Sequence, residues 1–498
     1  MENFILKKTY LAFDLGASSG RAILGILENG KLSLEEVHRF SNGPVEMEGS
    51  LYWDFGSICS EIKTGLKKAL AVEKNISGMA VDTWGVDYVI LKKDGSCARL
   101  PYNYRDPRTD SMPEKVFSVI PKEKLYERTG IQFMQLNTIY QLAAHREKHP
   151  GDFEEGNTLL FVPDAITYML CGKKSCEYTI ASTSNLVDAE KRDWDRELIS
   201  MLGLPCGLFP SIKMPGTVAG TLSPQIMNEL NCGPVPVMYV GSHDTASAVA
   251  SVPADESKKW AYISCGTWAL LGAELKSPIL SMDAMDSDYT NEGGLCGSIR
   301  FLTNIMGSWL FQETKRVWNE KGNPIGFAEM SKLASSAEPF KYFINPNDKR
   351  FFTPCDMPEN IRRSCKESGQ GAIEDDAALL RCIYDSLALC FRYKIEKLEK
   401  LLGVNYECLN MVGGATRDTL LMQLTSDCVG IPVYAGPVEA TSIGNICTQA
   451  MADGAIPNLA LARGLIRDSF DIPEFKPDKA ASSGWGSAYS RFKGVTGL

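Results

Sequence analysis

Apolar residues recur along the chain at strand and helix spacings, and they predict a mixture of both elements. The apolar run Tyr10 to Leu15 is followed by the small residues Gly16 to Gly20 and by a second apolar run, Arg21 to Leu27. This order predicts a β-hairpin with a wide tip. A helix is expected over Ser57 to Leu70. Its apolar residues at helical spacing are Ile58, Ile62, Leu66 and Ala69.

The same order of elements returns in the second half of the chain. Trp260 to Cys265 predicts a strand, Gly266-Thr267 a turn, and Trp268 to Glu274 another strand. A chain of 498 residues is too long for one ordinary hydrophobic core. We therefore expect one α/β plan used twice, with a boundary near Ser251 to Asp255, a first domain over residues 1–252 and a second over residues 253–498.

Further elements are expected in both halves. Strands are predicted over Val235 to Val240 and Tyr406 to Val412, and one long helix or two helices over Asp375 to Leu402. His145 and His149 lie four residues apart but lack the metalloprotease pattern, so they are interpreted as a solvated helix end.

Composition narrows the function classes. The formal net charge is −9, which disfavours nucleic acid as a partner. The 15 cysteines include no CxxC pair, which favours a reduced, cytoplasmic protein. No apolar stretch is long enough for a membrane span, and Met1 to Lys8 lacks the apolar core of a signal peptide. A P-loop motif is also absent.

The first chemical motif is the hairpin tip around residues 14–21. Its small residues leave backbone N–H groups open to phosphate oxygens. Asp14 could hold Mg²⁺ through water, while Ser18, Ser19 and Arg21 could contact phosphate. An ordinary hairpin turn remains the alternative, and the same two interpretations apply to Ser264 to Thr267 in the second hairpin.

Three other segments carry candidate chemistry. Gly241 to Ala248 leads from a strand into a helix, where Asp244 could accept a proton from a sugar hydroxyl or could merely cap the helix. Gly413-Gly414 could lie against a nucleoside or form a plain turn. Asp82 to Asp87 combines carboxylates with Trp84, which could face a sugar or belong to the core.

In this order the segments resemble the FGGY carbohydrate kinases, a family of the actin, hexokinase and heat-shock chaperone ATPase superfamily. The likeness runs from about residue 10 to 450. It is carried also by Thr290 to Gly294, Asn304 to Gly307, Ile344 to Asp348 and Ala435 to Ala440. The resemblance implies two actin-like (ribonuclease H-like) α/β domains with a central cleft. Within the family, the segments are most similar to the branch that acts on L-rhamnulose.

The resemblance also implies roles for single residues. Asp244 is the expected proton acceptor and Asp14 the expected metal-holding residue. The implied sugar contacts are Gly85, His243, Asp244, Thr245 and Asn304. The implied nucleotide contacts are Ala17, Ser18, Ser19, Gly20, Arg21, Thr267, Gln312 and Gly414. One departure is Ala415, which stands where the family has a third glycine and requires a negative φ.

The expected activity is transfer of the γ-phosphoryl group of Mg·ATP to O1 of the ketose L-rhamnulose. We expect a cytoplasmic monomer or weak homodimer with no nucleic acid or membrane partner. Three alternatives stay open: a relative acting on L-fuculose, L-ribulose, D-xylulose or glycerol, a non-enzymatic ATP-binding module, and a silent sugar sensor.

Overall fold

The chain packs into two compact units. The computed structural model describes residues 7–478 and 482–498, so Met1 to Lys8 lies largely outside the described residues. Unit 1 comprises Met1–Ser251, Glu274–Phe301 and Ala440–Ser469, and unit 2 comprises Val252–Ala273, Leu302–Glu439 and Phe470–Leu498. The expected boundary meets the first division point. The units are defined by packing, so the division by function into residues 1–252 and 253–498 stays a prediction.

Unit 1 is built on a six-stranded sheet with the order β13-β14-β6-β1-β2-β3. The predicted hairpin is formed by β1 and β2, which pair antiparallel, while β1 also pairs parallel with β6. The strands are β1 (Lys8–Leu15), β2 (Ser19–Glu28), β3 (Lys31–Ser41), β6 (Gly78–Thr83), β13 (Thr217–Thr221) and β14 (Pro236–Tyr239).

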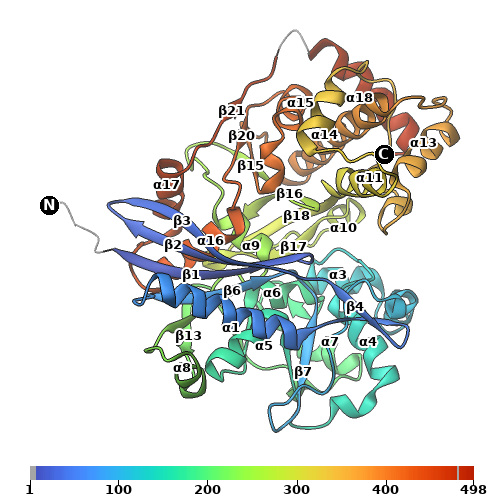
Figure 1. The fold of residues 1–498 in the computed structure, drawn as a ribbon. Helices are drawn as coiled ribbons and strands as arrows, with labels where there is room; N and C mark the ends of the chain where they lie inside the picture. Colours follow the sequence, from blue (N-terminus) through green and yellow to red (C-terminus); the bar gives the residue numbers. More distant parts are fainter. Residues whose placement is uncertain (1–6, 479–481) are drawn as a thin grey trace. The chain divides into compact units, whose positions relative to one another are not determined.

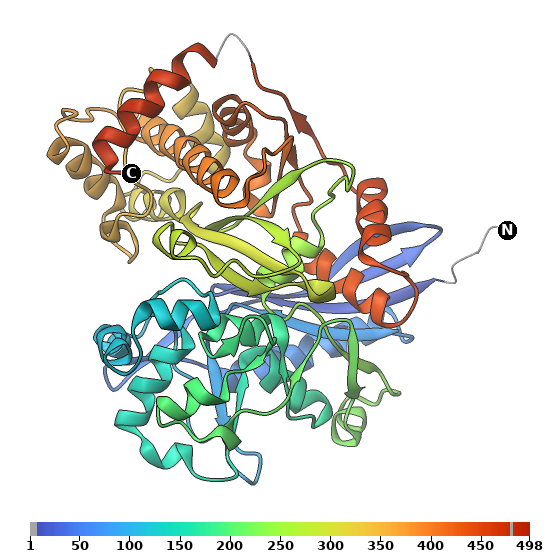
Figure 2. The same cartoon turned by 180° about the vertical axis from the view of Figure 1, so that it is seen from behind.

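Helices cover both faces of this sheet (Figures 1 and 2). On one face lies α1 (Phe55–Val72), which Asp54 caps and whose predicted apolar residues are buried. On the other face lie α9 (Asp244–Ala250) and α16 (Ala440–Ala452), side by side. Because strand side chains alternate, Phe13 of β1 faces α1 while Asp14 faces α16.

Glycines set how closely these layers approach. A Cβ at Gly65 of α1 would lie 2.7 Å from the Phe13 ring, and a Cβ at Gly25 of β2 would lie 2.5 Å from Ile446 of α16. The tightest approach is between the two helices, where a Cβ at Gly444 would lie 1.7 Å from the Ser247 carbonyl oxygen. The start of α9 is thereby held close to α16.

The rest of unit 1 consists of short elements around this sheet. The helices are α2 (Met112–Val119), α3 (Lys122–Thr129), α4 (Thr138–Lys148), α5 (Val162–Cys171), α6 (Tyr178–Ala181), α7 (Arg196–Met201), α8 (Pro224–Leu230), α10 (Met282–Asp286) and α17 (Leu459–Ser469). The strands are β4 (Pro44–Met47), β5 (Ser50–Trp53), β7 (Tyr88–Leu91), β8 (Thr158–Phe161), β9 (Cys176–Glu177), β10 (Val187–Asp188), β11 (Asp193–Trp194), β12 (Ile212–Lys213) and β17 (Thr290–Gly293).

Unit 2 repeats the plan, with strands in the order β18-β16-β15-β19-β20-β21. Here β15 pairs antiparallel with β16 and parallel with β19, as β1 does with β2 and β6. The strands are β15 (Trp260–Cys265), β16 (Trp268–Leu275), β18 (Ile299–Met306), β19 (Cys408–Val412), β20 (Val433–Ala435) and β21 (Glu474–Phe475). The division of the chain falls inside two of them, so the last two residues of β16 and the first three of β18, Arg300 included, belong to unit 1. The helices are α11 (Trp309–Glu320), α12 (Phe327–Ser335), α13 (Met357–Glu367), α14 (Asp376–Leu402), α15 (Thr419–Val429) and α18 (Ser482–Thr496).

One interpretation from the sequence is only partly right. Helix α4 does end at Lys148 with exposed residues, but His145 in its last turn lies in the interior, with 3% of its surface exposed. Its Nδ1 lies 2.9 Å from the Tyr88 hydroxyl and its Nε2 lies 2.8 Å from Asp152. Burial lowers its pKa to about 4, which favours the neutral ring.

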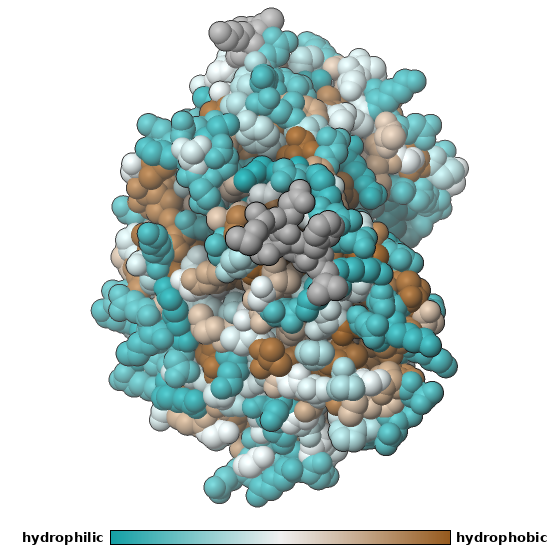
Figure 3. Space-filling view, turned by 90° about the vertical axis from the view of Figure 1, so that its left-hand side faces the viewer, coloured by the Kyte–Doolittle hydropathy of each residue, from teal (hydrophilic) through white to brown (hydrophobic). Residues whose placement is uncertain are grey.

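The surface is mixed in character. Figure 3 shows a face on which hydrophilic side chains predominate and hydrophobic ones form scattered groups. Among the described residues, no helix combines the length and apolar character that crossing a membrane requires.

Candidate active site

Three carboxylates gather in unit 1 where its strands end. Asp14 of β1 and Asp82 of β6 are direct partners in the parallel pairing. The next residue on β6, Thr83, bridges to His243, which directly precedes Asp244 at the start of α9. Parallel pairing and one helix start thus bring together side chains more than 200 positions apart in sequence.

Asp14, the predicted metal-holding residue, is held on one side only. Its Oδ2 accepts a hydrogen bond from Arg21 Nη2 at 2.6 Å and another from Ser442 Oγ at 3.0 Å. Asp14 and Arg21 face each other across the hairpin register. The pair therefore presents a fixed carboxylate and a fixed guanidinium at the same strand end.

Asp82 is fully buried, and Asn445 Nδ2 of α16 donates a hydrogen bond to its Oδ2 at 2.6 Å. Burial raises the pKa of this carboxyl well above its usual range, and the negative charge of Asp14 raises it further. The sequence left open whether the Asp82 to Asp87 segment faces a sugar, and the structure places the Asp82 side chain against α16.

The predicted phosphate loop is an exposed, compact turn. Gly16 N–H donates to the Ser19 carbonyl at 2.9 Å, and Asn42 Nδ2 donates to the Gly16 carbonyl at 2.9 Å. Ser18 is exposed and Ala17 half-buried. Gly20 is required here because a Cβ would lie 2.2 Å from the Phe40 ring. The loop is thus rigid at its base and open at its tip.

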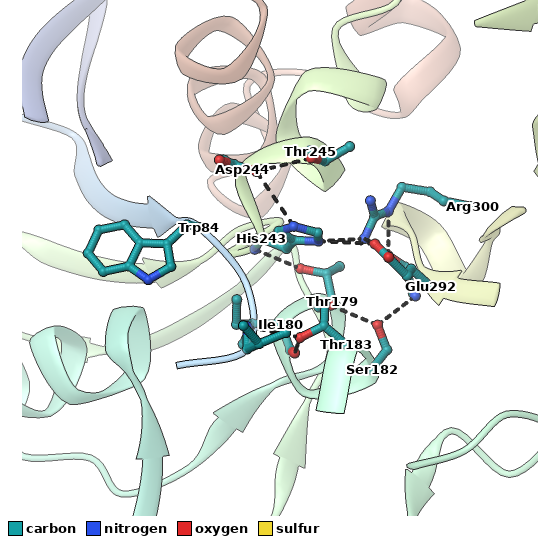
Figure 4. A network of polar contacts seen from close by, with 12 residues as sticks. Trp84, Thr179, Ile180, Ser182, Thr183, His243, Asp244, Thr245, Glu292 and Arg300 are labelled. Carbon is teal, nitrogen blue, oxygen red and sulfur yellow. Dashed lines mark hydrogen bonds and ion pairs between the residues drawn. The ribbon is translucent and has the colours of Figure 1, made fainter. Parts of the chain in front are cut away.

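Asp244 does not cap its helix. His243 occupies the N-cap position of α9, and no side chain caps this helix. Asp244 Oδ1 instead accepts a hydrogen bond from Thr245 Oγ1 at 3.0 Å and lies 3.6 Å from His243 Nε2 (Figure 4). Burial raises the pKa of Asp244, His243 opposes the rise, and the charge of Asp14 adds to it. A carboxylate of raised pKa beside a helix start is suited to accept a proton.

Gly85 lies against the His243 ring. A Cβ at Gly85 would lie 3.3 Å from His243 Nε2 and 3.5 Å from Thr183 Oγ1. The structure therefore brings Gly85, His243, Asp244 and Thr245 together, and their role as sugar contacts stays a prediction.

Trp84 belongs to the core rather than to a sugar-stacking surface. It is 6% exposed, and its ring centroid lies 4.0 Å from that of Trp53. Asp87 Oδ2 accepts hydrogen bonds from Trp53 Nε1 at 2.6 Å and Trp84 Nε1 at 3.0 Å. Of the two interpretations of this tryptophan, the structure favours the core.

Sequence reasoning missed two charged residues beside His243. Its Nδ1 lies 3.2 Å from Glu292 Oε2 and 3.1 Å from Arg300 Nη2 (Figure 4). Glu292 stood in a segment that carried the family resemblance, but only as a sequence match. Arg300 gave no signal, because one arginine in an apolar strand has no recognisable spacing.

Two predicted nucleotide contacts of unit 2, Thr267 and Gly414, follow the ends of β15 and β19, while Gln312 lies on α11. Thr267 Oγ1 donates to Gln312 Oε1 at 3.4 Å, and the Thr267 carbonyl accepts from Gly307 N–H at 3.2 Å. Asn304, predicted to contact sugar, belongs to this unit, and its carbonyl accepts from Asn347 Nδ2 at 3.0 Å.

The two glycines of the Gly413-Gly414 turn are needed for different reasons. Gly413 has a φ of 95°, and a Cβ there would lie 2.9 Å from the Cys265 carbonyl oxygen. A Cβ at Gly414 would meet nothing within 4 Å, so the space beside it is open. Ala415 is not among the described residues of positive φ, so its methyl group strains no backbone.

Comparisons with known proteins agree with this architecture. Residues 9–250 match the N-terminal domain of the FGGY family of carbohydrate kinases, and residues 261–452 match its C-terminal domain. A protein named rhamnulokinase from Bacteroides thetaiotaomicron is 42% identical over 488 residues, which cover 98% of this chain and 99% of that protein. A rhamnulokinase from Oceanobacillus iheyensis is 41% identical, covering 94% of this chain and 98% of that protein.

Solved structures of two other kinases share the fold. Gluconate kinase from Lactobacillus acidophilus superposes with a TM-score of 0.82 at 13% identity, covering 98% of both chains. Plasmodium falciparum glycerol kinase with ADP superposes with a TM-score of 0.78 at 15% identity, covering 99% of both chains. The predicted fold class, α/β with two actin-like ATPase domains, is confirmed.

Proposed function

Because the chain belongs to the FGGY family of carbohydrate kinases, we propose that it phosphorylates O1 of L-rhamnulose with ATP, giving L-rhamnulose 1-phosphate and ADP. The choice of sugar is supported by curated relatives named rhamnulokinase, which align over nearly the whole chain. The observation that carries the reaction type is Asp244, a carboxylate at a helix start that does no capping and has a raised pKa.

Asp244 is the group that receives the proton. As the bond forms between sugar O1 and the γ-phosphorus, the bond from that phosphorus to ADP breaks and the O1 proton passes to Asp244. Thr245 holds Asp244 through its hydroxyl, which fixes the direction of the carboxylate. His243 and Gly85 lie beside Asp244. Because Gly85 has no side chain, the Nε2 edge of the His243 ring stays accessible.

The residues fit the co-substrate and a metal ion. The exposed tip of the Gly16–Ser18 turn and the open space beside Gly414 suit phosphate and nucleoside respectively. Asp14 would hold Mg²⁺, because Arg21 and Ser442 bind one of its oxygens and leave the other without a hydrogen bond from the described residues. Bound Mg²⁺ supplies charge neutralisation at the phosphate oxygens. Among the described residues no three side chains, Asp14, Asp82 and Asp244 included, are placed to hold one metal ion together, so we infer that the nucleotide would supply further ligands.

A panel of acceptors tests the proposal. ADP release is measured with L-rhamnulose, L-fuculose, L-ribulose, D-xylulose and glycerol, and without any sugar. We expect the largest kcat/KM with L-rhamnulose. A larger value with another sugar would replace the substrate, while equal ADP release without sugar would favour a non-kinase ATPase. Sugar binding without turnover would favour a sensor.

We further propose that the protein works in the cytoplasm as a monomer or weak homodimer. The absence of disulfides among the 15 cysteines supports a reducing compartment. Light scattering after size exclusion, over a range of concentrations, measures the oligomeric state. A constant mass of twice 54.8 kDa at low concentration would replace the proposal with a stable dimer.

A further inference from the structure

The His243 ring lies between charges on both of its edges. Its Nε2 faces Asp244 Oδ1 at 3.6 Å, while its Nδ1 faces Glu292 Oε2 at 3.2 Å and Arg300 Nη2 at 3.1 Å. Figure 4 shows the ring between Asp244 on one side and the Glu292–Arg300 pair on the other. The distance on the Asp244 side is too long for a full hydrogen bond, so the Nε2 edge keeps capacity for another partner.

Glu292 and Arg300 form a buried ion pair. Arg300 is 0% exposed, its Nη2 lies 3.1 Å from Glu292 Oε2, and its Nε donates to the Gly293 carbonyl at 2.8 Å. Gly293 N–H in turn donates to Ser182 Oγ at 2.7 Å. Burial alone would raise the pKa of Glu292, but Arg300 and then His243 lower it below its usual value, so Glu292 is ionised.

Arg300 suits a bare Nδ1 and Glu292 suits a protonated Nδ1, while Asp244 on the other edge favours a proton on Nε2 in both cases. When Nδ1 carries no proton, it accepts a hydrogen bond from Arg300 Nη2, and the proton of the neutral ring lies on Nε2. When the ring is cationic, Nδ1–H donates to Glu292 and Nε2 is protonated as well. The remaining state, with the single proton on Nδ1, would turn the Nε2 lone pair toward the Asp244 carboxylate and is disfavoured by repulsion.

We propose that Glu292 and Arg300 are positioning residues that keep a proton on His243 Nε2, so that the ring donates a hydrogen bond where the sugar hydroxyl meets Asp244. The role in catalysis rests on the proposed sugar kinase function. The backbone of His243 is fixed as well, because its N–H donates to Thr179 Oγ1 at 3.2 Å.

With its proton fixed on Nε2, His243 binds the sugar while Asp244 accepts the proton. His243 Nε2–H binds a sugar oxygen and cannot accept the proton of the reacting hydroxyl, which leaves Asp244 as the acceptor. With the opposite tautomer, the ring would compete with Asp244 for that proton and would offer the sugar no donor. Positioning errors of this kind cost about 10²-fold in rate.

The first test observes the tautomer directly. The chain has only four histidines, so ¹⁵N-histidine labelling gives four ring systems to resolve by NMR. A His243→Asn variant identifies the His243 signals by their loss. We expect a protonated, pyrrole-type Nε2, whether Nδ1 is bare or protonated. A bare, pyridine-type Nε2 in the wild-type protein would overturn the proposal, and this result needs no folded variant of the pair.

The second test changes the pair and uses a matched control. Arg300→Lys keeps the charge but loses the planar fork that reaches both Gly293 and the His243 ring. We expect kcat/KM for the sugar to fall about 10- to 100-fold, with the nucleotide Kd unchanged and the Nδ1-protonated tautomer becoming detectable. Arg463→Lys is the control, because Arg463 is 3% exposed, pairs with Glu274 and donates to the Val249 carbonyl at the far end of α9 from His243. The control is expected to lose stability alone.

The outcomes separate this inference from the proposed function. Equal losses of turnover in Arg300→Lys and Arg463→Lys, with the His243 tautomer unchanged, would reduce Arg300 to a structural residue. If the wild-type protein prefers another sugar while Nε2 stays protonated, the choice of L-rhamnulose fails and the positioning role stands. If L-rhamnulose is the preferred acceptor while Nε2 is bare, the positioning role fails and the function stands.

Discussion

The β1–β2 hairpin of unit 1 and the β15–β16 hairpin of unit 2 share a strand plan and differ in chemistry. In unit 1, Asp14 is the last but one residue of β1 and faces Arg21 on β2. In unit 2, Ser264 is the last but one residue of β15 and faces Leu270 on β16. The parallel neighbours of these strands differ in the same way. Asp14 lies beside Asp82 of β6, whereas Ser264 lies beside Val412 of β19.

The contrast shows that the strand plan fixes where residues meet but not what they do. Unit 1 uses charge at this place, with three carboxylates, a guanidinium and a histidine. Unit 2 has no charged side chains at the corresponding positions of its strands. Its Gly413 packs its backbone against β15, and its Gly414 leaves an open space beside the turn. Hence we expect variants of the unit 1 carboxylates to change the chemical step and variants of the unit 2 glycine turn to change nucleotide affinity.

The largest effect is expected from Asp244→Asn in unit 1. Asparagine keeps the shape and the acceptor for Thr245 but cannot take a proton, so turnover should fall about 10²-fold or more. The unfolding temperature and ATP affinity should be retained, because the variant removes a charge that burial already disfavours. Steady-state ADP release, thermal unfolding and calorimetric titration measure these quantities. Turnover near the wild-type value would remove Asp244 from the reaction.

A matched pair of variants at the two hairpins comes next. Asp14→Asn should lower turnover by about 10- to 100-fold and raise the Mg²⁺ concentration needed for half-maximal rate, since a carboxylate is lost from the metal side. Ser264→Ala changes the corresponding position of unit 2 and should alter turnover less than about threefold, the range of a small side-chain change. Magnesium titrations at saturating sugar compare them. Equal losses in both variants would remove the proposed division of labour.

Sequence reasoning reached most of the fold because the decisive elements had local signals. The first strand and turn of each hairpin were visible in apolar runs broken by small residues, and β15 spans the predicted residues, Trp260–Cys265. The sequence predicted helix over the residues of α14 but left open whether they form one helix or two. The structure has one helix there.

What sequence reasoning missed depends on contacts between distant elements. The close approach of Gly444 to Ser247 brings α16 against α9, and no local pattern encodes that crossing. The Asp82–Asn445 contact follows from the same crossing. The roles of Glu292 and Arg300 were missed for a related reason, since each acquires a meaning only through the His243 ring.

A smaller effect on activity is expected at the Gly413-Gly414 turn of unit 2, where the space beside Gly414 is open. Gly414→Val should raise the KM for ATP about tenfold, an amount typical of a misplaced small group at a binding surface, and leave stability unchanged. Gly413→Ala should do the reverse and cost about 1–3 kcal/mol of stability, because its φ is positive and its Cβ would strike the Cys265 carbonyl. Thermal unfolding and nucleotide titration separate the two. Loss of stability in Gly414→Val would mean that the space beside it is not free.

The subtlest expected effect is a displacement of the pH profile that only unit 1 variants produce. Asp244 accepts a proton only when ionised, so turnover should rise with pH, and its raised pKa should place this rise above the range of an ordinary aspartate. His243 lowers the pKa of Asp244 and Asp14 raises it. His243→Gln should therefore move the rise to higher pH, and Asp14→Asn should move it to lower pH. Thr267→Val in unit 2 should leave it in place. The residual turnover of each variant is measured across pH at saturating substrate concentrations. If His243→Gln and Asp14→Asn displace the pH profile in the same direction, Asp244 is not the titrating base.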